Sequence, residues 1–303
     1  MPGYSTEDYA RTCSHLGEPV RMTGSDAWLL RRNIPGSELT DLVGPYPIFC
    51  SSKLGELRVD LERLESDDVS LTCVLDPLET SAGIGLATEV FPDLLVPFKR
   101  HFFVDLRSDF AAARSSHHRR SVSRASRNVE VNAATDPGEH VQEWAELYDS
   151  LRQDKRFQGG PSDFSESALE AQLELPGVSY YRATSNGTCV AASLWIEHGD
   201  RIYYHLGASS DRGRSLKASF SIFDRALGDA ASRGLSWACL GGAAGLKDDA
   251  ADGLAFFKRG WATDTHTAYL AGRVLNRGAY EALCGATMPR GGYFPAYRGG
   301  SPE

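Results

Sequence analysis

Apolar and polar residues alternate most regularly in the middle of the second half, where three short stretches have the pattern of β-strands. The predicted strands are 177–184, 188–197 and 201–206. Two turn-forming sequences, Ser185-Asn186-Gly187 and His198-Gly199-Asp200, separate them. This part of the chain therefore predicts an antiparallel meander.

Helical spacing of apolar residues is found on both sides of this meander. It predicts an amphipathic helix over 137–155 and a shorter helix over 165–175. After the meander, a polar loop over 208–214 leads into a long helix that ends at Gly234. Its apolar stripe consists of Leu216, Phe220, Phe223, Leu227 and Ala230. The elements predicted beyond it are a buried strand over 235–240, a helix over 250–259, a strand over 266–274 and a helix around Tyr280.

The first half shows fewer clear elements. Strands are predicted at 27–30, 69–75 and 101–106, and a helix follows over 108–127. Strands and helices alternate along the whole chain, which predicts an α/β fold with a mixed (α+β) sheet rather than an all-helical or all-β fold.

Composition narrows the class of protein. The chain has 303 residues, of which 42% are hydrophobic and 24% charged, as in ordinary globular proteins. Its length favours two domains or one large one. It has neither an apolar run of the roughly 20 residues that span a membrane nor a secretory signal at its start, so we expect no membrane association. The six scattered cysteines indicate reduced core residues of a cytoplasmic protein.

Charge is unevenly distributed. The net charge of −8 argues against a protein that binds nucleic acid over its whole surface. Residues 110–129, however, contain no acidic residue but hold Arg114, Arg119, Arg120, Arg124, Arg127, His117 and His118. This run predicts either a helix that contacts phosphates, which we favour, or a solvated helix whose arginine stems pack on the core.

Four further sequences carry a resemblance to a known family. They are Tyr-Tyr-His-Leu-Gly-Ala-Ser at 203–209, the Ala-rich stretch at 226–235, Leu-Gly-Gly at 240–242, and Asp-Gly-Leu-Ala-Phe-Phe-Lys-Arg-Gly-Trp at 252–261. Their order, together with that of the elements, resembles the FemAB-like branch of the GNAT acyltransferase superfamily, whose members carry two GNAT-like folds in tandem. The last sequence is similar to the Phe-Lys-x-Gly-aromatic signature of that branch. Weaker similarities extend upstream to 104–106, 129–131 and 144–148, and to Gly-Pro-Tyr-Pro at 44–47.

The resemblance implies two domains, a degenerate GNAT-like domain over 1–127 and a catalytic one over 128–303. It implies that strands 201–206 and 235–240 diverge to grip an acyl donor. Lys258 would then lie at the acyl centre and stabilise an oxyanion, with Phe257 beside the end of the donor. The alternative for Lys258 is a solvated cation at the end of a helix.

His205 is a candidate general base, because it shares a strand face with Tyr203 and Arg201 and its usual pKa suits proton transfer near neutrality. It could equally be a core histidine. Asp211 and Asp252 are other candidates, and each could instead serve as a turn residue or a helix cap. The residues expected to bind the donor are Tyr203, Arg212, Arg214, Lys217, Gly241, Gly242, Asp252 and Trp261.

The donor itself is expected to be aminoacyl-tRNA. CoA-dependent GNAT enzymes carry Arg/Gln-x-x-Gly-x-Gly/Ala before the long helix, whereas Lys217 stands here where a glycine is expected. FemAB-like proteins without that motif commonly use aminoacyl-tRNA, whose phosphates would meet Arg119, Arg120, Arg124 and Arg127. No other cofactor is expected, and the spacing of the eight histidines predicts no metal site.

The predicted activity is therefore the formation of an amide bond by transfer of an aminoacyl group to a small-molecule amine, in secondary metabolism such as antibiotic biosynthesis. The alternatives are an acyl-CoA-dependent N-acyltransferase, an aminoacyltransferase acting on a peptidoglycan precursor, and a GNAT-like module that binds a ligand without catalysis.

Overall fold

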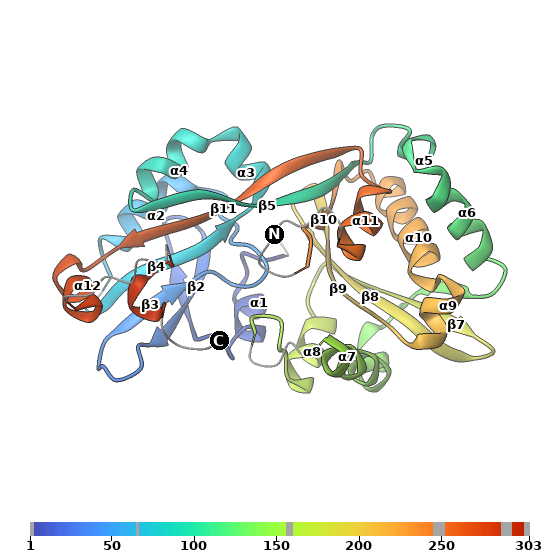
Figure 1. Cartoon of the computed structure of the whole chain (residues 1–303), viewed down its shortest axis with the longest axis horizontal. Helices are drawn as coiled ribbons and strands as arrows, with labels where there is room; N and C mark the ends of the chain where they lie inside the picture. Colours follow the sequence, from blue (N-terminus) through green and yellow to red (C-terminus); the bar gives the residue numbers. More distant parts are fainter. Residues whose placement is uncertain (1–2, 65–66, 156–159, 245–251, 286–292, 300–303) are drawn as a thin grey trace. The chain divides into compact units, whose positions relative to one another are not determined.

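A computed structural model describes residues 3–64, 67–155, 160–244, 252–285 and 293–299 (Figure 1). The chain forms two compact units. Unit 1 comprises Met1–Gly3, Lys99–Gln158 and Asp163–His266, and unit 2 comprises Tyr4–Phe98, Gly159–Ser162 and Thr267–Glu303.

These units differ from the domains predicted over 1–127 and 128–303, because the chain passes between them more than once. Strand β5 (Leu94–Asp105) leaves unit 2 and enters unit 1, and strand β11 (Asp264–Val274) returns to unit 2. The predicted boundary after residue 127 consequently falls inside unit 1.

The sheet of unit 1 contains the predicted meander. Its strand order is β5-β10-β9-β8-β7-β6, in which β9 and β10 are parallel and all other neighbours antiparallel. The strands after β5 are β6 (Glu130–Ala133), β7 (Val178–Ser185), β8 (Thr188–His198), β9 (Arg201–Ser209) and β10 (Trp237–Gly241). The three predicted meander strands correspond to β7, β8 and β9, so the prediction is confirmed.

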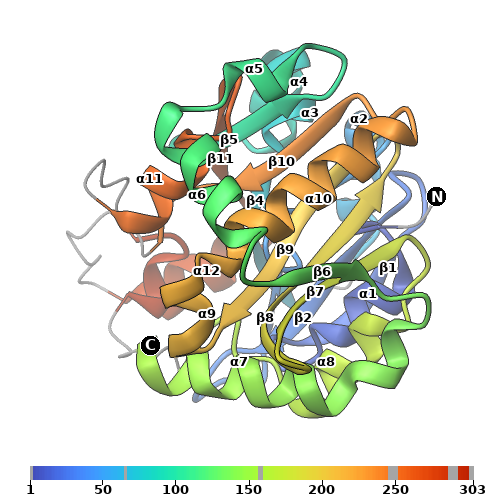
Figure 2. The same ribbon diagram turned by 90° about the vertical axis from the view of Figure 1, so that its right-hand side faces the viewer.

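Helices cover both faces of this sheet (Figure 2). On one face lie α6 (Ser116–Ala125) and α10 (Ala218–Ser232), and on the other α7 (Val141–Lys155) and α8 (Glu166–Leu173). Aromatic contacts illustrate the two layers. Trp195 of β8 packs on Phe223 of α10, with ring centroids 5.0 Å apart, whereas Tyr180 of β7 faces Trp144 of α7 at 5.9 Å.

Two predicted elements of unit 1 have a different form. The helix predicted over 108–127 is split into α5 (Phe110–Ala113) and α6, because the side chain of Ser115 caps α6 by accepting from the backbone N–H of His118. The loop predicted over 208–214 folds instead into a short helix, α9 (Asp211–Leu216), which Ser210 caps in the same way. Lys217 then adopts a left-handed conformation (φ 62°) that separates α9 from α10.

Unit 2 has its own mixed sheet in the order β1-β2-β3-β4-β11, with only β3 and β4 parallel. Its strands, besides part of β5 and β11, are β1 (Glu18–Met22), β2 (Ala27–Asn33), β3 (Thr40–Val43) and β4 (Asp68–Leu75). Its helices are α1 (Glu7–Thr12), α2 (Leu54–Leu61), α3 (Pro77–Ala82), α4 (Ile84–Val90), α12 (Arg277–Cys284) and the 3-10 turn η2 (Ala296–Arg298). The predicted mixed α/β fold class is confirmed. Across the described residues, no helix has the length and apolar character that crossing a membrane requires.

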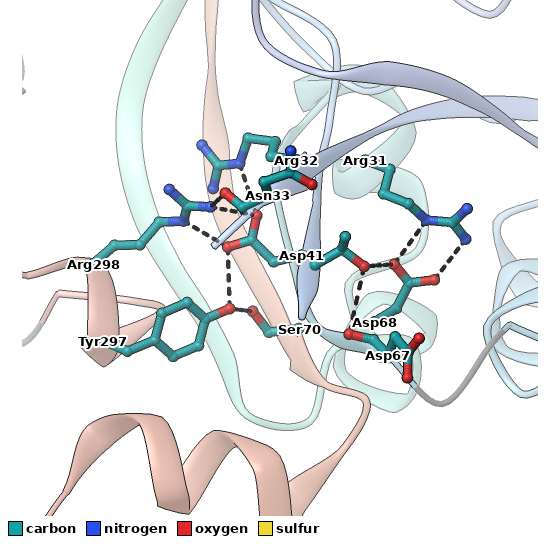
Figure 3. A network of polar contacts seen from close by, with 10 residues as sticks. Arg31, Arg32, Asn33, Asp41, Asp67, Asp68, Ser70, Tyr297 and Arg298 are labelled. Atoms are coloured by element: carbon teal, nitrogen blue, oxygen red, sulfur yellow. Dashed lines mark hydrogen bonds and ion pairs between the residues drawn. The ribbon is translucent and has the colours of Figure 1, made fainter. Parts of the chain in front are cut away.

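A polar network fastens η2 to the sheet of unit 2 (Figure 3). Asp41 is fully buried and accepts hydrogen bonds from the guanidinium groups of Arg32 and Arg298, at 2.8 and 2.6 Å, and from the Tyr297 hydroxyl. Asp68 receives two bonds from Arg31 in the same unit, at 2.9 and 2.7 Å. Asp41 and Asp68 therefore each have at least one arginine partner.

Candidate active site

Lys258 is held in the interior of unit 1 by the short helix α11 (Gly253–Arg259). The helix begins where Asp252 accepts a hydrogen bond from the backbone N–H of Ala255 at 3.1 Å, and the same carboxylate accepts from the N–H of Ala244 at 3.0 Å. Burial opposes ionisation of Asp252, but these N–H groups outweigh it and hold its pKa below the usual value. Asp252, predicted to bind the donor, thus fixes α11 to the end of β10.

The Lys258 side chain is only 6% exposed. Its Nζ atom donates a hydrogen bond to the carbonyl oxygen of Gly242 at 2.7 Å and lies 5.6 Å from the centre of the Tyr204 ring. Gly241 has φ +75°, and a Cβ atom there would lie 3.2 Å from Nζ. The two glycines predicted to line the site therefore surround the ammonium, and Lys258 is not a solvated cation at a helix end.

This position lies where two neighbouring parallel strands part. The β9–β10 ladder pairs Trp237 with Arg201, Ala238 with Ile202 and Cys239 with Tyr203. Although β9 continues to Ser209 and β10 to Gly241, the ladder between their described residues stops at Cys239 and Tyr203. The carbonyl that Lys258 binds and the Tyr204 ring both follow this last pair. The expected divergence of the two strands is thus present, and it leaves backbone groups that a ligand could bind.

Ionisable groups of both signs act on the ammonium. Burial lowers the pKa of Lys258 to about 8. The nearby charge of Lys99 acts in the same direction, whereas Cys239 and Asp252 act against it. The Lys99 ammonium lies 3.4 Å from the carbonyl oxygen of Ala243, the residue after the one that Lys258 binds. Burial, together with both lysines, lowers the pKa of His101 to about 3 and keeps that ring neutral.

Lys99 and His101 were not predicted from the sequence. Both belong to β5, and the Nδ1 atom of His101 lies 3.9 Å from the Sγ atom of Cys239 on β10. The only signal in the sequence was their place at the start of the strand predicted over 101–106. Their proximity to Lys258 depends on strand pairing between residues more than 130 positions apart, which local patterns do not report.

The aromatic residues around Lys258 belong to the core of unit 1. The Phe257 ring packs on Phe223 and Phe220 at 4.8 and 4.9 Å, and Trp261 is 1% exposed. A Cβ atom at Gly260 would lie 1.9 Å from the His118 ring, so a larger residue could not occupy this position without displacing α6. These residues of the Phe-Lys-x-Gly-aromatic sequence pack α11 against α6. Because Trp261 is buried, it offers no surface to a donor in this conformation, and a donor contact by Phe257 stays a prediction.

His205 has a different set of neighbours from Lys258. The ladder between β8 and β9 contains a bulge that leaves His205 opposite no residue of β8. Its ring lies 6.0 Å from Phe164, whereas the adjacent Tyr204 contacts Phe223 of α10. Burial lowers the pKa of His205 to about 3. Tyr203, on the predicted shared face, is also buried, and the role of His205 as a base stays a prediction.

The basic residues predicted around the donor loop mostly have partners within the protein. Arg214 is ion-paired with Asp154 at 3.0 Å and with Asp211. Arg212 donates a hydrogen bond to the Ser185 hydroxyl at 3.2 Å. Gly213 lies so close to β8 that a Cβ atom would be 2.1 Å from a backbone oxygen. Helix α9 is therefore packed against the sheet. Lys217 forms the turn between α9 and α10 rather than part of an open loop that binds phosphate.

The basic run at 110–129 divides into two groups. Arg114 is 12% exposed, ion-paired with Asp224, and stacked 5.1 Å from the Trp261 ring centre. Four other arginines have exposed side chains, and none of them forms an ion pair with a carboxylate in the described part of the chain. They are Arg119, Arg120, Arg124 and Arg127. The four arginines predicted to meet phosphates therefore point to solvent with their charge uncompensated.

Comparisons with known proteins agree with this geometry. Residues 111–259 match the family model described as acetyltransferase (GNAT) domain. This segment of the chain is a GNAT domain. No curated protein matches the sequence. The matched residues include the diverging strands, helix α10 and Lys258, so this GNAT protein is an acyltransferase whose family segment contains the candidate site.

Solved structures extend the likeness to nearly the whole chain. FemX is 14% identical and has a TM-score of 0.67, with 91% of this chain and 93% of FemX covered. The C-terminal domain of a putative lysylphosphatidylglycerol synthetase from Agrobacterium fabrum is 13% identical with a TM-score of 0.62, covering 92% of each chain. L-PGS from Bacillus licheniformis is 15% identical with a TM-score of 0.59, covering 88% of this chain and 87% of that one. The GNAT protein thus has the fold of the FemAB-like branch.

Proposed function

We propose that this GNAT protein transfers an aminoacyl group from aminoacyl-tRNA to the amine of a small molecule. The observation that carries the proposal is the buried ammonium of Lys258 at the point where β9 and β10 part. Its hydrogen bond goes to a neutral carbonyl oxygen and burial lowers its pKa, so the ammonium is suited to stabilise negative charge that develops beside it.

The reaction would proceed in two steps at this ammonium. The neutral nitrogen of the acceptor attacks the carbonyl carbon of the aminoacyl ester, which forms the C–N bond and places negative charge on the carbonyl oxygen. Lys258 donates a hydrogen bond to that oxygen in exchange for its bond to Gly242. The C–O bond to the ribose then breaks, the ribose oxygen gains a proton, and the nitrogen loses one.

The protonation state of Lys258 suits this role. With a pKa of about 8, its side chain is protonated in roughly nine molecules of ten at pH 7, by the ordinary titration relation. The same pKa makes it a stronger acid than an ordinary lysine. It could therefore also supply the proton that the leaving ribose oxygen needs.

Two observations favour tRNA over CoA as the carrier of the acyl group. The four exposed arginines at and after α6 provide an uncompensated cationic surface suited to a polyanion. The segment before α10, in contrast, is filled by α9, with Arg214 already paired to two carboxylates. An acyl-CoA-dependent N-acyltransferase remains the alternative for the donor.

The direct test offers the purified protein a mixture of charged tRNAs and, separately, a panel of acyl-CoAs, each with a library of amines. Mass spectrometry identifies the amide formed. We expect product with charged tRNA, its loss after RNase treatment, and its loss in Lys258→Met. Arg259→Met, one residue away on the exposed side of α11, is the matched control and should retain activity. RNase-resistant product from acyl-CoA would instead establish the alternative donor.

The same assay separates the possible acceptors. Lysylphosphatidylglycerol synthetase, which shares this fold, is named for a lysyl group on phosphatidylglycerol, so vesicles of that lipid form a second set of acceptors. A peptidoglycan precursor forms a third. Binding of charged tRNA without turnover of any acceptor would favour the non-catalytic module. We place the small-molecule reaction in the cytoplasm and in secondary metabolism.

A further inference from the structure

One large apolar side chain on α11 is exposed beside the candidate site. Phe256, two residues before Lys258, has 54% of its surface exposed, whereas its neighbour Phe257 lies in the core. The ring of Phe256 lies 5.7 Å from the ring of His117 on α6, at an interplanar angle of 68°. His117 is itself exposed to solvent. Two aromatic rings from different helices therefore meet at the surface of unit 1.

The ring of His117 contacts two residues on the side that faces the protein. Its Nε2 atom lies 3.5 Å from the hydroxyl of Ser121, which is buried, and its ring is 5.9 Å from Phe220 of α10. An edge contact of this kind fixes the ring while leaving one side in contact with solvent. The exposed pair is therefore supported by contacts of His117 with Ser121 and Phe220.

The arginine face of α6 begins at this pair. Arg120 and Arg124 follow His117 by three and seven residues, so all three side chains lie on one face of the helix. Both arginines are exposed. Phe256, His117, Arg120 and Arg124, which we call the Phe256 platform, thus combine aromatic rings at one end with two cationic groups along the helix.

We propose that the Phe256 platform binds the unpaired 3′ strand of the tRNA, with a base stacked on Phe256 and His117 and phosphates bound by Arg120 and Arg124. This inference rests on the proposed function. Aromatic side chains beside a cationic track are the arrangement by which proteins bind single-stranded nucleic acid without reading its sequence. Helix α11 carries both Phe256 and Lys258, but residues two apart lie on nearly opposite faces of a helix, so the strand bound at the surface would pass around this short helix to reach the buried ammonium.

An anionic lipid surface is the other polyanion to consider, and the composition of the platform argues against it. A helix that lies in a membrane interface presents a broad apolar face together with its basic residues. The exposed residues of α6 are instead serine, histidine and arginine, and Phe256 is the single large apolar residue that is highly exposed in the described part of unit 1. One ring suffices to stack a base but buries little area in a bilayer.

The test measures binding of fluorescent tRNA by anisotropy, using intact tRNA and tRNA trimmed of its unpaired 3′ end. We expect Phe256→Ala to weaken binding of intact tRNA by about 5- to 100-fold, the usual effect of removing a stacking ring, and to leave binding of trimmed tRNA unchanged. Phe256→Trp should restore the affinity. Arg120→Ala and Arg124→Ala should each reduce the salt dependence of binding by about one phosphate contact.

Matched controls come from elsewhere in the chain. Tyr293 is an aromatic residue of unit 2 with 48% exposure, so Tyr293→Ala removes a similar ring from another surface. Arg225 on α10 is exposed but paired with Asp229, so Arg225→Ala removes an arginine whose charge is compensated. Neither change should alter tRNA binding.

The possible failures are distinguishable. If intact tRNA binds to wild type with a clear salt dependence but Phe256→Ala binds it equally well, the platform is overturned and the proposed donor stands. If wild type binds no tRNA, the proposed function is overturned and the platform with it. Loss of binding to phosphatidylglycerol vesicles in Phe256→Ala, with unchanged tRNA binding, would assign the platform to a lipid surface and overturn this inference.

Discussion

Two buried carboxylates of unit 2, Asp41 and Asp68, and the buried ammonium of Lys258 in unit 1 have different kinds of hydrogen-bond partner. In unit 2, the carboxylates of Asp41 and Asp68 are each about 1% exposed and receive bidentate or multiple bonds from arginine side chains. In unit 1, the Lys258 ammonium is buried to a similar degree, but its hydrogen bond goes to a neutral carbonyl oxygen and its pKa falls to about 8.

This difference separates structural from functional charge. A buried ion whose partners neutralise it can only hold elements together, as the Asp41 cluster holds η2. A buried ion whose hydrogen bond goes to a neutral group, like that of Lys258, has a lowered pKa, and an anion that binds there would stabilise its charged form. The comparison therefore predicts that removing the two kinds of charge has opposite effects on stability and on activity.

The largest effect is expected from Lys258→Met. Loss of the oxyanion partner should lower kcat by about 10²- to 10³-fold. The free energy of unfolding should rise by about 1–3 kcal/mol, because the variant no longer buries a cation whose pKa is depressed. Transfer assays and urea titration measure the two quantities. A destabilised Lys258→Met protein would show that the ammonium is structural and end the contrast between the units.

Asp41→Ala should have the reverse profile. Removing this carboxylate leaves the partly buried guanidinium groups of Arg32 and Arg298 without their shared ion-pair partner, which should cost about 3–5 kcal/mol of stability while kcat of the remaining folded protein changes little. Glu62→Ala is the matched control, because its ion pair with Arg58 is exposed on both sides and should contribute less than about 1 kcal/mol. Equal effects of the two changes in urea titration would contradict this interpretation.

Gly260→Ala tests the packing that keeps Lys258 in place. The added methyl group would overlap the His118 ring, which lies between α6 and α11, so we expect a loss of about 1–3 kcal/mol in stability together with reduced kcat. Gly228→Ala provides the control, since a Cβ atom at that helical position on α10 meets open space. If Gly260→Ala lowered stability without lowering kcat, the position of Lys258 would not depend on this contact.

The pH dependence should show the smallest effect. If catalysis requires the charged form of Lys258, kcat decreases as the pH rises through about 8, by about tenfold per pH unit well above that value. Stability should change in the opposite sense. The unfolded chain retains the lysine proton up to its ordinary pKa of 10.5, so it binds more protons than the folded state between pH 8 and 10.5 and stability rises with pH there. A kcat that keeps rising to pH 10 would exclude the charged form.

Much of unit 1 could be predicted from the sequence. The turn chemistry around Asn186 and Gly199 and the apolar stripe of α10 act locally, so they report β7 to β9 and the long helix directly. The division of the helix predicted over 108–127 was harder to predict. The Ser115 hydroxyl caps a new helix there, so the chain forms two helices in place of one.

Interactions between distant residues could not be predicted at all. Lys99 and His101 approach Lys258 because β5 pairs with β10. The chain passes from one unit to the other along β5 and back along β11, and no local sequence pattern indicates this. Asp41 likewise finds Arg298 from the other end of the chain. The family resemblance assigned Lys258 to the acyl centre and Trp261 to donor binding; both side chains are buried in unit 1, and both roles stay predictions.

The place of β5 beside β10 has a practical consequence for dissecting the protein. A fragment cut to the family-matched residues 111–259 would lack Phe102, Val104 and Leu106 of the unit 1 core, and also Trp261. It would turn β10 into an unprotected edge that invites self-association. The minimal portion suitable for separate production therefore begins before residue 99 and ends after residue 266, well outside the limits that sequence similarity suggests.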